Sequence, residues 1–537
     1  MAQARDRESV VVRFQPAGIR AVVPRGSTIL DAARSHGLEI DAPCGGHGTC
    51  GACRVTVQAG TTEPTPNELD LLTSDELSAG ARLACHARVT GDVTVVTRSR
   101  KATRILDTVA GVPEELRAWS LPDMPQRNGF GVAVDIGTTT LAANLVDLHE
   151  GTVAGRASAL NPQRMFGADV MSRISAATEF GVDHLREPLV AEVERMLLSM
   201  LADAEISEQD LSDIVVVGNT AMTGLLQAED VSPLGRAPYS ASWLDGATVR
   251  ADALGMSRLW QAALHILPGS SAFIGADVVA GLAACGITDD EGPTLFVDLG
   301  TNGEIVLVSD GVFRATSTAA GPALEGASIE HGLMAEEGAI ERVVRTGTGF
   351  ELEVIGGGEP RGICGSGLID AIAMLLDAKV IDSSGRFLAC DPGHLHMHVD
   401  SHETGDRFVL DMASQVHINQ RDIRQFQLAA SAVRTGIALL LEDARVGPDA
   451  VRSVVFAGGF GTHTSPDSLV RTGLIAAEWR DRMRFAGNSA LGGAVGALTG
   501  RHPSDELAAL AQRIETLDLA TRPDFQDRFL AFLRFPG

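Results

Sequence analysis

The chain has 537 residues, 45% hydrophobic and 21% charged, and this length suits two or three packed domains. Its formal net charge of -25 makes nucleic acid an unfavourable partner, because phosphate backbones repel an acidic surface. The first nine residues lack the apolar stretch of a signal peptide, and no apolar run approaches the roughly 18 residues of a membrane helix. We therefore expect a cytoplasmic protein without a nucleic-acid or membrane partner.

Residues 9–98 predict a domain of short strands and tight turns. Residues 10–14 and 18–23 are rich in β-branched side chains, and Pro16-Ala-Gly18 between them indicates a hairpin. Ser27 or Thr28 can cap a helix that runs to about His36. A loop rich in Gly and Cys follows, and then a strand at 54–58. Strand, strand, helix, loop, strand is the order of an α+β unit of the ubiquitin-like β-grasp type.

Four of the seven cysteines lie in this first domain, which favours metal binding over a disulfide framework. Three are on one short loop and the fourth follows later in the sequence: Cys44, Cys50, Cys53 and Cys85. Four thiolates can hold an iron–sulfur cluster or a structural zinc ion. Zinc ribbons have two Cys-x-x-Cys knuckles, whereas this sequence has one.

The glycines of the cysteine loop favour a cluster over zinc. Cluster sulfides accept hydrogen bonds, so the backbone must wrap closely around them, and glycine permits the conformations that this requires. The loop holds four such residues, Gly45, Gly46, Gly48 and Gly51. The five residues between Cys44 and Cys50 are similar to the spacing of adrenodoxin-like domains. We expect a [2Fe–2S] cluster, with zinc or structural thiols as the alternative.

Residues 99–128 predict a linker, because they contain Pro113, Pro122 and Pro125 and follow a short basic run. From residue 129 to 537, strand patterns alternate with helical ones, which indicates an α/β domain. Buried-type strands recur at 131–135, 214–218, 294–298 and 454–458, with long helical stretches at 185–201 and 427–441. Two of the strands end in Asp-(Ile/Leu)-Gly-Thr, which suggests an internal duplication.

Each of these two strand ends predicts a phosphate-binding hairpin. In Asp135-Ile-Gly-Thr-Thr-Thr140, backbone N–H groups and threonine hydroxyls can surround phosphate oxygens, and the Asp can hold Mg²⁺ through water. Asp298-Leu-Gly-Thr-Asn-Gly-Glu304 repeats the pattern, and Phe456-Ala-Gly-Gly-Phe-Gly461 offers backbone for an adenosine. No Walker-type motif is present. A nucleotide-free α/β domain with ordinary turns is the alternative.

The three motifs, in this order and separation, resemble the phosphate-1, phosphate-2 and adenosine motifs of the actin, heat-shock chaperone and sugar-kinase superfamily. Fused to a ferredoxin-like domain, the chain resembles the reductive activators of corrinoid proteins over nearly its whole length. Some members of that family have a small extra domain after the linker, which this sequence lacks. The matching segments are 218–222, 273–278, 317–322, 362–370, 420–425 and 487–493.

The resemblance implies a duplicated actin-like, sugar-kinase-like ATPase domain with two subdomains around a nucleotide cleft. It also implies an enzyme that uses ATP to reduce inactive Co(II) to Co(I) in a corrinoid protein of a methyltransferase system. Electrons would come from a donor protein or reductase and pass through the cluster. We expect a homodimer.

By the same resemblance, the four cysteines hold the cluster, and Asp135 and Asp298 position Mg²⁺ and the attacking water. Glu304 is a further candidate for water activation, with a structural hydrogen bond as the alternative. Ser366 can reach the partner protein or simply form a tight turn at the start of a helix. The nucleotide-binding residues are Gly137, Thr138, Thr139, Thr140, Gly300, Thr301, Asn302 and Gly303 at the phosphates, and Gly458, Gly459 and Gly461 at the adenosine.

Three other functions fit parts of the sequence. A small-molecule kinase with an attached redox domain would phosphorylate an acceptor without a protein partner. A nucleotide-dependent binding switch would bind ATP tightly and deliver no electron. An activator of the 2-hydroxyacyl-CoA dehydratase type would use a [4Fe–4S] cluster at a dimer interface, a placement that nothing in the sequence matches.

Overall fold

The computed structural model describes residues 9–38, 40, 42, 44–48, 50–57, 60–97, 129–287, 292–326, 328–347, 349–388, 394–402, 405–458 and 464–536. The predicted linker and two predicted adenosine residues, Gly459 and Gly461, lie outside these ranges. Among the described helices, none combines the length and apolar character needed to cross a membrane.

Two compact units make up the chain. The first contains residues 1–103, 161–189 and 230–236, and the second contains 104–160, 190–229 and 237–537. The predicted boundaries of the ferredoxin-like domain, linker and ATPase domain stay predictions.

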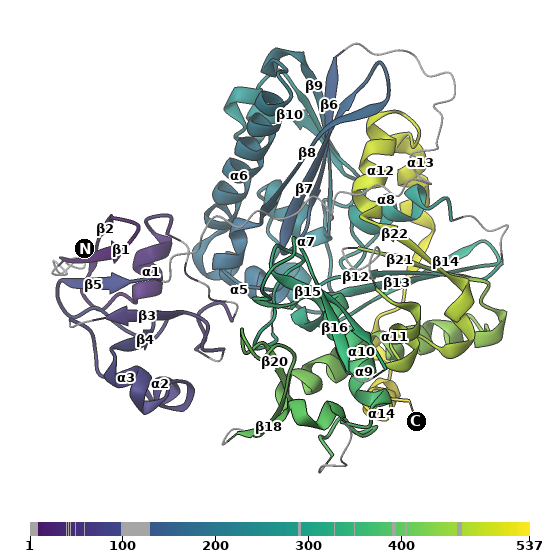
Figure 1. The fold of residues 1–537 in the computed structure, drawn as a ribbon. Helices are drawn as coiled ribbons and strands as arrows, with labels where there is room; N and C mark the ends of the chain where they lie inside the picture. Colours follow the sequence, from purple (N-terminus) through teal and green to yellow (C-terminus); the bar gives the residue numbers. More distant parts are fainter. Residues whose placement is uncertain are drawn as a thin grey trace. The chain divides into compact units, whose positions relative to one another are not determined.

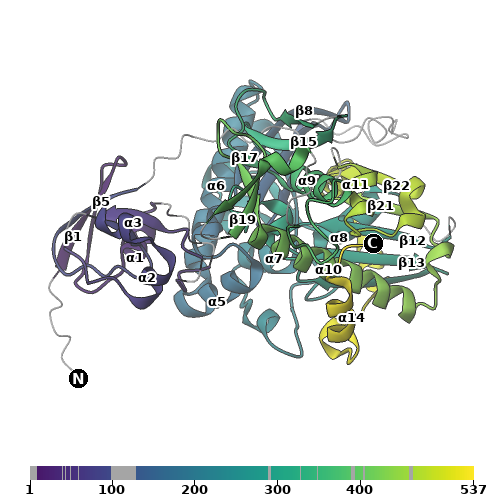
Figure 2. The same ribbon diagram turned by 60° about the horizontal axis from the view of Figure 1, so that its bottom comes forward.

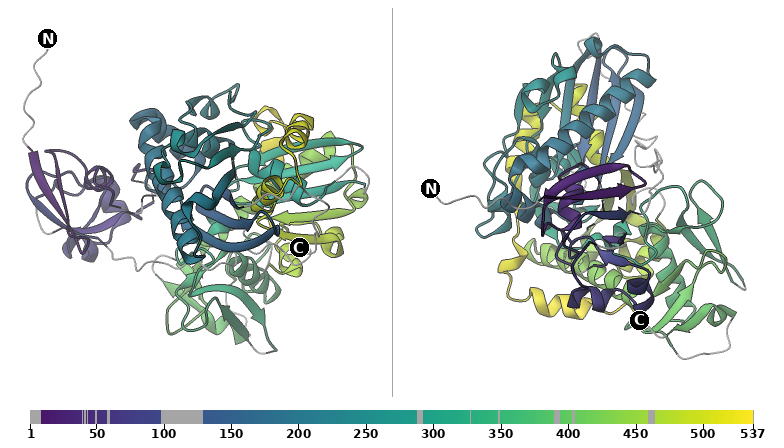
Figure 3. Two further views of the ribbon diagram at one scale, coloured as in Figure 1. Left: turned by 90° about the horizontal axis from the view of Figure 1, so that it is seen from above. Right: turned by 90° about the vertical axis from the view of Figure 1, so that its left-hand side faces the viewer.

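The first unit contains a five-stranded sheet in the order β2-β1-β5-β3-β4, drawn in purple and dark blue in Figure 3. Strands β1 and β5 are parallel, and the other pairs are antiparallel. Helix α1 (Ile29–Arg34) begins at Thr28, whose hydroxyl accepts a 3.0 Å hydrogen bond from the N–H of Asp31. This is the predicted β-grasp arrangement. The strands are β1 (Ser9–Gln15), β2 (Ile19–Pro24), β3 (Arg54–Val57), β4 (Ala81–Leu83) and β5 (Val93–Val96).

A buried ion pair links the short helix α2 (Pro66–Leu71) to strand β4. Glu68 is fully buried and accepts hydrogen bonds from Nε and Nη2 of Arg82, at 2.9 and 3.0 Å, and from the N–H of Leu83 at 3.0 Å. Thr65 caps the helix and also donates its N–H to Glu68. The charge is therefore buried with its hydrogen bonds made, the condition under which a buried ion pair is tolerated.

The second unit contains two six-stranded sheets that share the topology of five of their strands. The first has the order β10-β11-β9-β6-β7-β8 and the second β22-β21-β12-β13-β14-β23. In both sheets, three strands that follow one another in sequence form an antiparallel meander: β6, β7 and β8 in the first sheet, and β12, β13 and β14 in the second. Two further strands continue the sheet beside the first strand of the meander and run parallel to it: β9 and β11 in the first sheet, and β21 and β22 in the second. This repetition agrees with the predicted duplication. The central strands are β6 (Phe130–Ile136), β7 (Thr140–Asp147), β8 (Thr152–Leu160), β9 (Leu211–Gly218), β12 (Thr294–Leu299), β13 (Gly303–Ser309), β14 (Val312–Thr318), β21 (Ser453–Ala457) and β22 (Met483–Gly487).

Helices α8 (Ala276–Ala284) and α12 (Ser489–Leu498) pack between the two sheets, as Figure 1 shows. One hydrophobic core contains residues of both helices and of both sheets, among them Val215 and Val306. The helices approach closely at Gly493, where a Cβ atom would lie 2.1 Å from the carbonyl oxygen of Ala280. Only glycine fits there, so backbone packing fixes the pair against each other.

Helix α10 (Gln420–Asp443) packs beside β13 and β14 of the second sheet (Figure 2). Its N-cap, Asn419, forms a capping box with Asp422. The predicted helical stretches 185–201 and 427–441 lie within α6 (Val182–Asp203) and α10, and the four predicted strands lie in β6, β9, β12 and β21. The remaining principal elements are α3 (Ser74–Ser78), α5 (Val170–Phe180), α7 (Thr220–Leu226), β10 (Ala247–Arg250), β11 (Ala263–Ile266), β15 (Ala339–Arg345), β16 (Phe350–Val354), β17 (Gly362–Ile363), α9 (Gly365–Asp377), β18 (Val399–His402), β19 (Gly405–Val409), β20 (His417–Asn419), α11 (Pro466–Arg471), α13 (Ser504–Arg513), β23 (Ile514–Thr516) and α14 (Phe525–Phe532).

Candidate functional site

The four predicted cluster cysteines form two neighbouring pairs in the first unit. The Sγ atoms of Cys53 and Cys85 are 3.3 Å apart, and Cys50 shares a side-chain hydrogen bond with Cys44. None of these four cysteines forms a disulfide. Two pairs of sulfurs match the need of a [2Fe–2S] cluster for two cysteine ligands on each iron.

The loop between these cysteines has the backbone that a cluster requires. Its four glycines all have positive φ, from 70° at Gly45 and Gly51 to 104° at Gly46. A Cβ atom on Gly48 would lie 1.8 Å from Nε2 of His86, so the loop is closed tightly at that point. The N–H of Ala52 donates to Sγ of Cys50 at 3.5 Å, the kind of contact that tunes cluster sulfurs. The four residues therefore fit the cluster, and their role as its ligands is a proposal.

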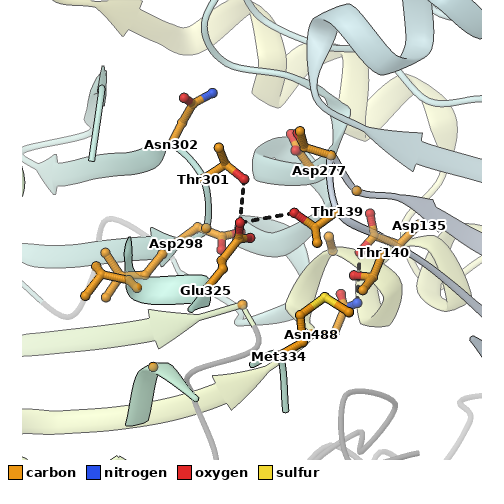
Figure 4. A pocket seen from close by; sticks show the side chains of 18 of the residues that line it. Asp135, Thr139, Thr140, Asp277, Asp298, Thr301, Asn302, Glu325, Met334 and Asn488 are labelled. Carbon is orange, nitrogen blue, oxygen red and sulfur yellow. Dashed lines mark hydrogen bonds between the residues drawn. The ribbon is translucent and has the colours of Figure 1, made fainter. Parts of the chain in front are cut away.

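The second site is a pocket in the second unit where the two predicted hairpins meet, shown in Figure 4. Strands β6 and β7 are joined by a turn at Gly137, where a Cβ atom would lie 2.6 Å from the carbonyl oxygen of Thr140. Strands β12 and β13 are joined in the same way, and Asp298 pairs in register with Glu304. Of the predicted site residues, the structure brings these to the pocket: Asp135, Gly137, Thr138, Thr139, Thr140, Asp298, Gly300, Thr301, Asn302, Glu304 and Gly458.

Gly303 does not line the pocket wall, but it starts β13 directly beside it. A Cβ atom at this position would lie 2.8 Å from Oγ1 of Thr318, so the hairpin needs glycine there. Gly458, at the end of β21, has φ of 84°, and its Cβ would lie 2.6 Å from Oδ1 of Asp298. Glycine at 458 therefore lets the end of β21 lie against the catalytic candidate Asp298.

Several carboxylates converge in this pocket with few opposite charges. Burial raises the pKa of Asp135 to about 6, although a hydrogen bond from Asn488 lowers it in part. Burial and then the neighbouring carboxylates Asp298 and Asp135 raise the pKa of Asp277 to about 8. Burial, Asp135 and Glu325 raise the pKa of Asp298 to about 7. Crowded buried carboxylates of this kind favour a divalent cation, for which oxygen ligands suit Mg²⁺.

Glu304 is a further acidic residue of the pocket, and a serine hydroxyl is its hydrogen-bond partner. Burial first, and then Asp277 and Asp298, raise its pKa well above its usual value, while the hydroxyl of Ser317 donates to it at 3.0 Å. A structural hydrogen bond, such as this one from Ser317, is the predicted alternative to water activation by Glu304. Glu304 lines the pocket as well, so its role stays a prediction.

One carboxylate joins the two hairpins. Oε2 of Glu325 accepts hydrogen bonds from Oγ1 of Thr139 at 3.1 Å and from Oγ1 of Thr301 at 2.6 Å, as the dashed lines in Figure 4 show. Nδ2 of Asn219 donates to Oγ1 of Thr138 at 3.0 Å. The hydroxyls that are predicted to bind phosphate are thus held in place by groups from elsewhere in the chain.

Four polar residues of this pocket had no role predicted from the sequence: Asn219, Asp277, Glu325 and Asn488. Three of them lie in segments that carried the family resemblance, 218–222, 273–278 and 487–493, so a signal was present. Asp277 is in the first turn of α8, and Asn219 and Asn488 are the N-caps of α7 and α12. Glu325 lay in no such segment.

Ser366 also lines the pocket, in the first turn of α9. Its hydroxyl donates to the carbonyl oxygen of Glu341 at 2.9 Å, which agrees with the tight turn expected at a helix start. A contact with a partner protein stays a prediction.

Comparison with protein families divides the sequence into three matched regions. Residues 12–90 match the 2Fe-2S iron-sulfur cluster binding domain, residues 130–290 match the RACo middle region, and residues 292–537 match the C-terminal domain of RACo, the ASKHA domain. These three ranges together span most of the chain.

Individual relatives are similar over most of their length. The corrinoid activation enzyme RamQ of Eubacterium limosum is 31% identical over 420 residues, which are 75% of this chain and 69% of the relative. The Co(II) methylated amine-specific corrinoid protein reductase of Methanosarcina barkeri is 24% identical over 440 residues, 76% of this chain and 77% of the relative. A solved structure of a reductive activator for corrinoid, iron-sulfur protein is 27% identical, with a TM-score of 0.71 over 98% of both chains.

Proposed function

The chain belongs to the RACo family of corrinoid activators, and from this premise we propose that it reduces the inactive Co(II) form of a corrinoid protein to Co(I) at the expense of ATP. The observation that carries the proposal is the presence, on one chain, of a cluster of four cysteines and of an acidic pocket built from two phosphate-type hairpins. The kinase alternative is not favoured, because the family match includes both parts.

The need for both parts follows from redox energetics. A bound [2Fe–2S] cluster supplies one electron at a time, and Co(II) takes up one electron to become Co(I). Each ~59 mV by which the cobalt potential lies below that of the donor lowers the yield tenfold. ATP binding and hydrolysis to ADP and phosphate can offset this, provided that the protein binds its partner differently in its two nucleotide states.

We assign the residues as follows. Cys44, Cys50, Cys53 and Cys85 would hold the cluster. Asp135 and Asp298, with Asp277 beside them, would hold Mg²⁺ through water, and Asp298 or Glu304 would orient the attacking water. The threonine hydroxyls and backbone N–H groups of the two hairpins would bind the phosphate oxygens.

The partner and donor are proposed by class only. The partner is a corrinoid protein of a methyltransferase system, and the donor is a reductase or electron-transfer protein. The cytoplasmic location and the homodimer stay predictions, the first resting on the use of cysteines for metal binding.

The test mixes anaerobic protein, a reductant, ATP and candidate Co(II) corrinoid proteins, and follows the cobalt absorption bands. We expect Co(I) to appear only with ATP. Cys50→Ser should abolish this while ATP binding persists, and Cys285→Ser, which changes a cysteine outside the loop, should leave it intact. Asp298→Ala should keep the cluster absorption and lose ATP-dependent reduction. ATP consumption that phosphorylates a small acceptor, with no Co(I) from any candidate, would replace this proposal by the kinase.

A further inference from the structure

A cluster of metal-ligating side chains lies in the second unit, outside the nucleotide pocket. It consists of Glu330, His331 and His417, and one ligand atom from each residue lies within 4.8 Å of the others. Oε1 of Glu330 is 3.7 Å from Nε2 of His417, and the two imidazole rings meet edge to face with centroids 4.3 Å apart. We propose that these three residues form a Zn²⁺ site.

The donor set and its dimensions suit zinc. Two imidazoles and one carboxylate, with a fourth position left for water, form a recurring zinc ligand set. Bonds of about 2.1 Å in a tetrahedral site place ligand atoms about 3.4 Å from one another. The 3.7 Å separation of Glu330 and His417 is close to this value, and all three ligand atoms lie within 4.8 Å of one another, so the proposed site closes through side-chain rotations.

The tautomer of His417 leaves the correct nitrogen free. Nδ1 lies 2.9 Å from the carbonyl oxygen of Gln415, and because a carbonyl only accepts, Nδ1 must carry the proton. In the neutral ring that binds a metal, Nε2, the atom that faces Glu330, then presents the lone pair. A histidine whose second nitrogen donates to a backbone carbonyl is the usual arrangement around a protein-bound metal.

The start of helix α10 holds Glu330, and strand β17 holds His331. Nδ2 of Asn419 donates to Oε2 of Glu330 at 2.5 Å, which leaves Oε1 for a metal. Oδ1 of Asp422 accepts the N–H of Glu330 at 2.9 Å. The carbonyl oxygen of His331 accepts the N–H of Ile363 at 2.8 Å, which fixes that residue to β17. Such outer contacts orient ligands before the metal binds.

The ligands link two parts of the second unit. Glu330 and His331 lie between Glu325 and Met334, which both line the nucleotide pocket, whereas His417 begins β20. Bound zinc would therefore fasten this segment to β20 and α10. Glu330 is exposed and His331 half-buried, so an ion can reach the site from solvent.

The test uses full-length protein with its iron content measured, dialysed against buffered low-micromolar Zn²⁺. We expect about one zinc per chain at this site, with zinc-edge X-ray absorption that shows nitrogen and oxygen neighbours. Glu330→Gln, His331→Ala and His417→Ala should each weaken zinc binding at least about tenfold, since even partners of ligands contribute that much. His149→Ala, at an exposed histidine outside the cluster, should bind zinc like the parent.

His417 is buried, so His417→Ala can lose zinc because the protein is destabilised. The zinc affinities of Glu330→Gln and His331→Ala therefore decide whether the site exists. Zinc should raise the melting temperature of the parent and of His149→Ala, but not of these two variants. Zinc binding that is absent, that survives both substitutions, or that shows sulfur neighbours from the cysteine loop would overturn the proposal.

Discussion

Asn488 donates a 2.8 Å hydrogen bond from Nδ2 to Oδ2 of Asp135, across 353 residues of sequence. The same side chain caps helix α12, because its Oδ1 accepts the N–H of Leu491 at 2.8 Å. One asparagine therefore joins the helix between the sheets to the end of β6, where Mg²⁺ is proposed to bind.

Asn488→Ser separates these two roles, because serine can cap a helix but is too short to reach Asp135. A buried carboxylate that loses a donor is destabilised by roughly 1–3 kcal/mol. We expect ATP, measured by calorimetry in the presence of Mg²⁺, to bind about tenfold more weakly. The cluster absorption should be unchanged. ATP affinity equal to that of the parent would mean that Asn488 acts only as a cap.

Glu325→Ala is expected to strengthen ATP binding. Glu325 occupies the hydroxyls of Thr139 and Thr301 and adds a negative charge to the pocket. Removing this carboxylate frees both hydroxyls to donate to phosphate and lowers the electrostatic repulsion of the triphosphate. We expect the affinity for ATP to rise about tenfold. Glu325→Gln keeps a hydrogen-bond acceptor but loses the charge, so its ATP affinity should lie between those of the parent and of Glu325→Ala. Weaker ATP binding in Glu325→Ala would instead assign Glu325 to the metal.

Gly48→Ala should lower the iron content of the purified protein. The added Cβ would lie 1.8 Å from Nε2 of His86, in addition to the strain of a positive φ. Gly18→Ala is a matched control, because Gly18 has a similar φ of 69° and open space around it. The double variant Gly48→Ala/His86→Ala removes the colliding ring and should recover part of the iron. Equal iron in Gly48→Ala and Gly18→Ala would contradict a closely fitted loop.

The ferredoxin-like domain should lose stability in acid. Burial tends to raise the pKa of Glu68, but the hydrogen bonds and charge of Arg82 and the N–H groups of Thr65 and Leu83 outweigh it, so the pKa is lowered from 4.5. A carboxylate with a lowered folded-state pKa adds stability above pH 4.5, and that contribution is lost as the pH falls through the folded-state pKa.

Glu68→Gln tests this contribution in the full-length protein. Removing one partner of a buried ion pair costs roughly 3–5 kcal/mol, so the variant should unfold at lower urea concentration at pH 7. Loss of the visible cluster absorption reports unfolding of this domain. The difference between parent and variant should shrink below pH 4.5, and a difference that stays constant into acid would contradict the assignment.

The features that were predicted correctly are those that depend on a short stretch of sequence. The cysteine loop, the two Asp-x-Gly-Thr hairpins and the Val-rich strands are each encoded in a short stretch, and the structure has them at the expected residues. The α/β fold was predicted correctly for the same reason, since strand and helix periods are local. The short strand β4 and helices α2 and α3 gave no periodic signal, because each is only a few residues long.

The missed pocket residues depend on contacts between distant segments. The partners of Asn488 and Glu325 are hundreds of residues away or on the opposite hairpin, and no spacing rule relates such pairs. Asp277 becomes a pocket residue only because α8 packs against α12 through Gly493. An Asn N-cap at a strand-to-helix turn was a local sign for Asn219 and Asn488, but Asp277 and Glu325 are not N-caps.

The hydrogen bonds of Glu325 with Thr139 and Thr301 affect which ligands the pocket can bind. The Glu325 carboxylate accepts hydrogen bonds from the hydroxyls that are proposed to bind a terminal phosphate, so a phosphate bound there would replace one anionic acceptor by another. Such an exchange yields little net hydrogen-bond energy, and a ligand that lacks a phosphate at this position has no means of displacing the carboxylate. If the hairpins bind a terminal phosphate as proposed, the Glu325 carboxylate competes with it, and we expect the pocket to bind triphosphate and diphosphate differently.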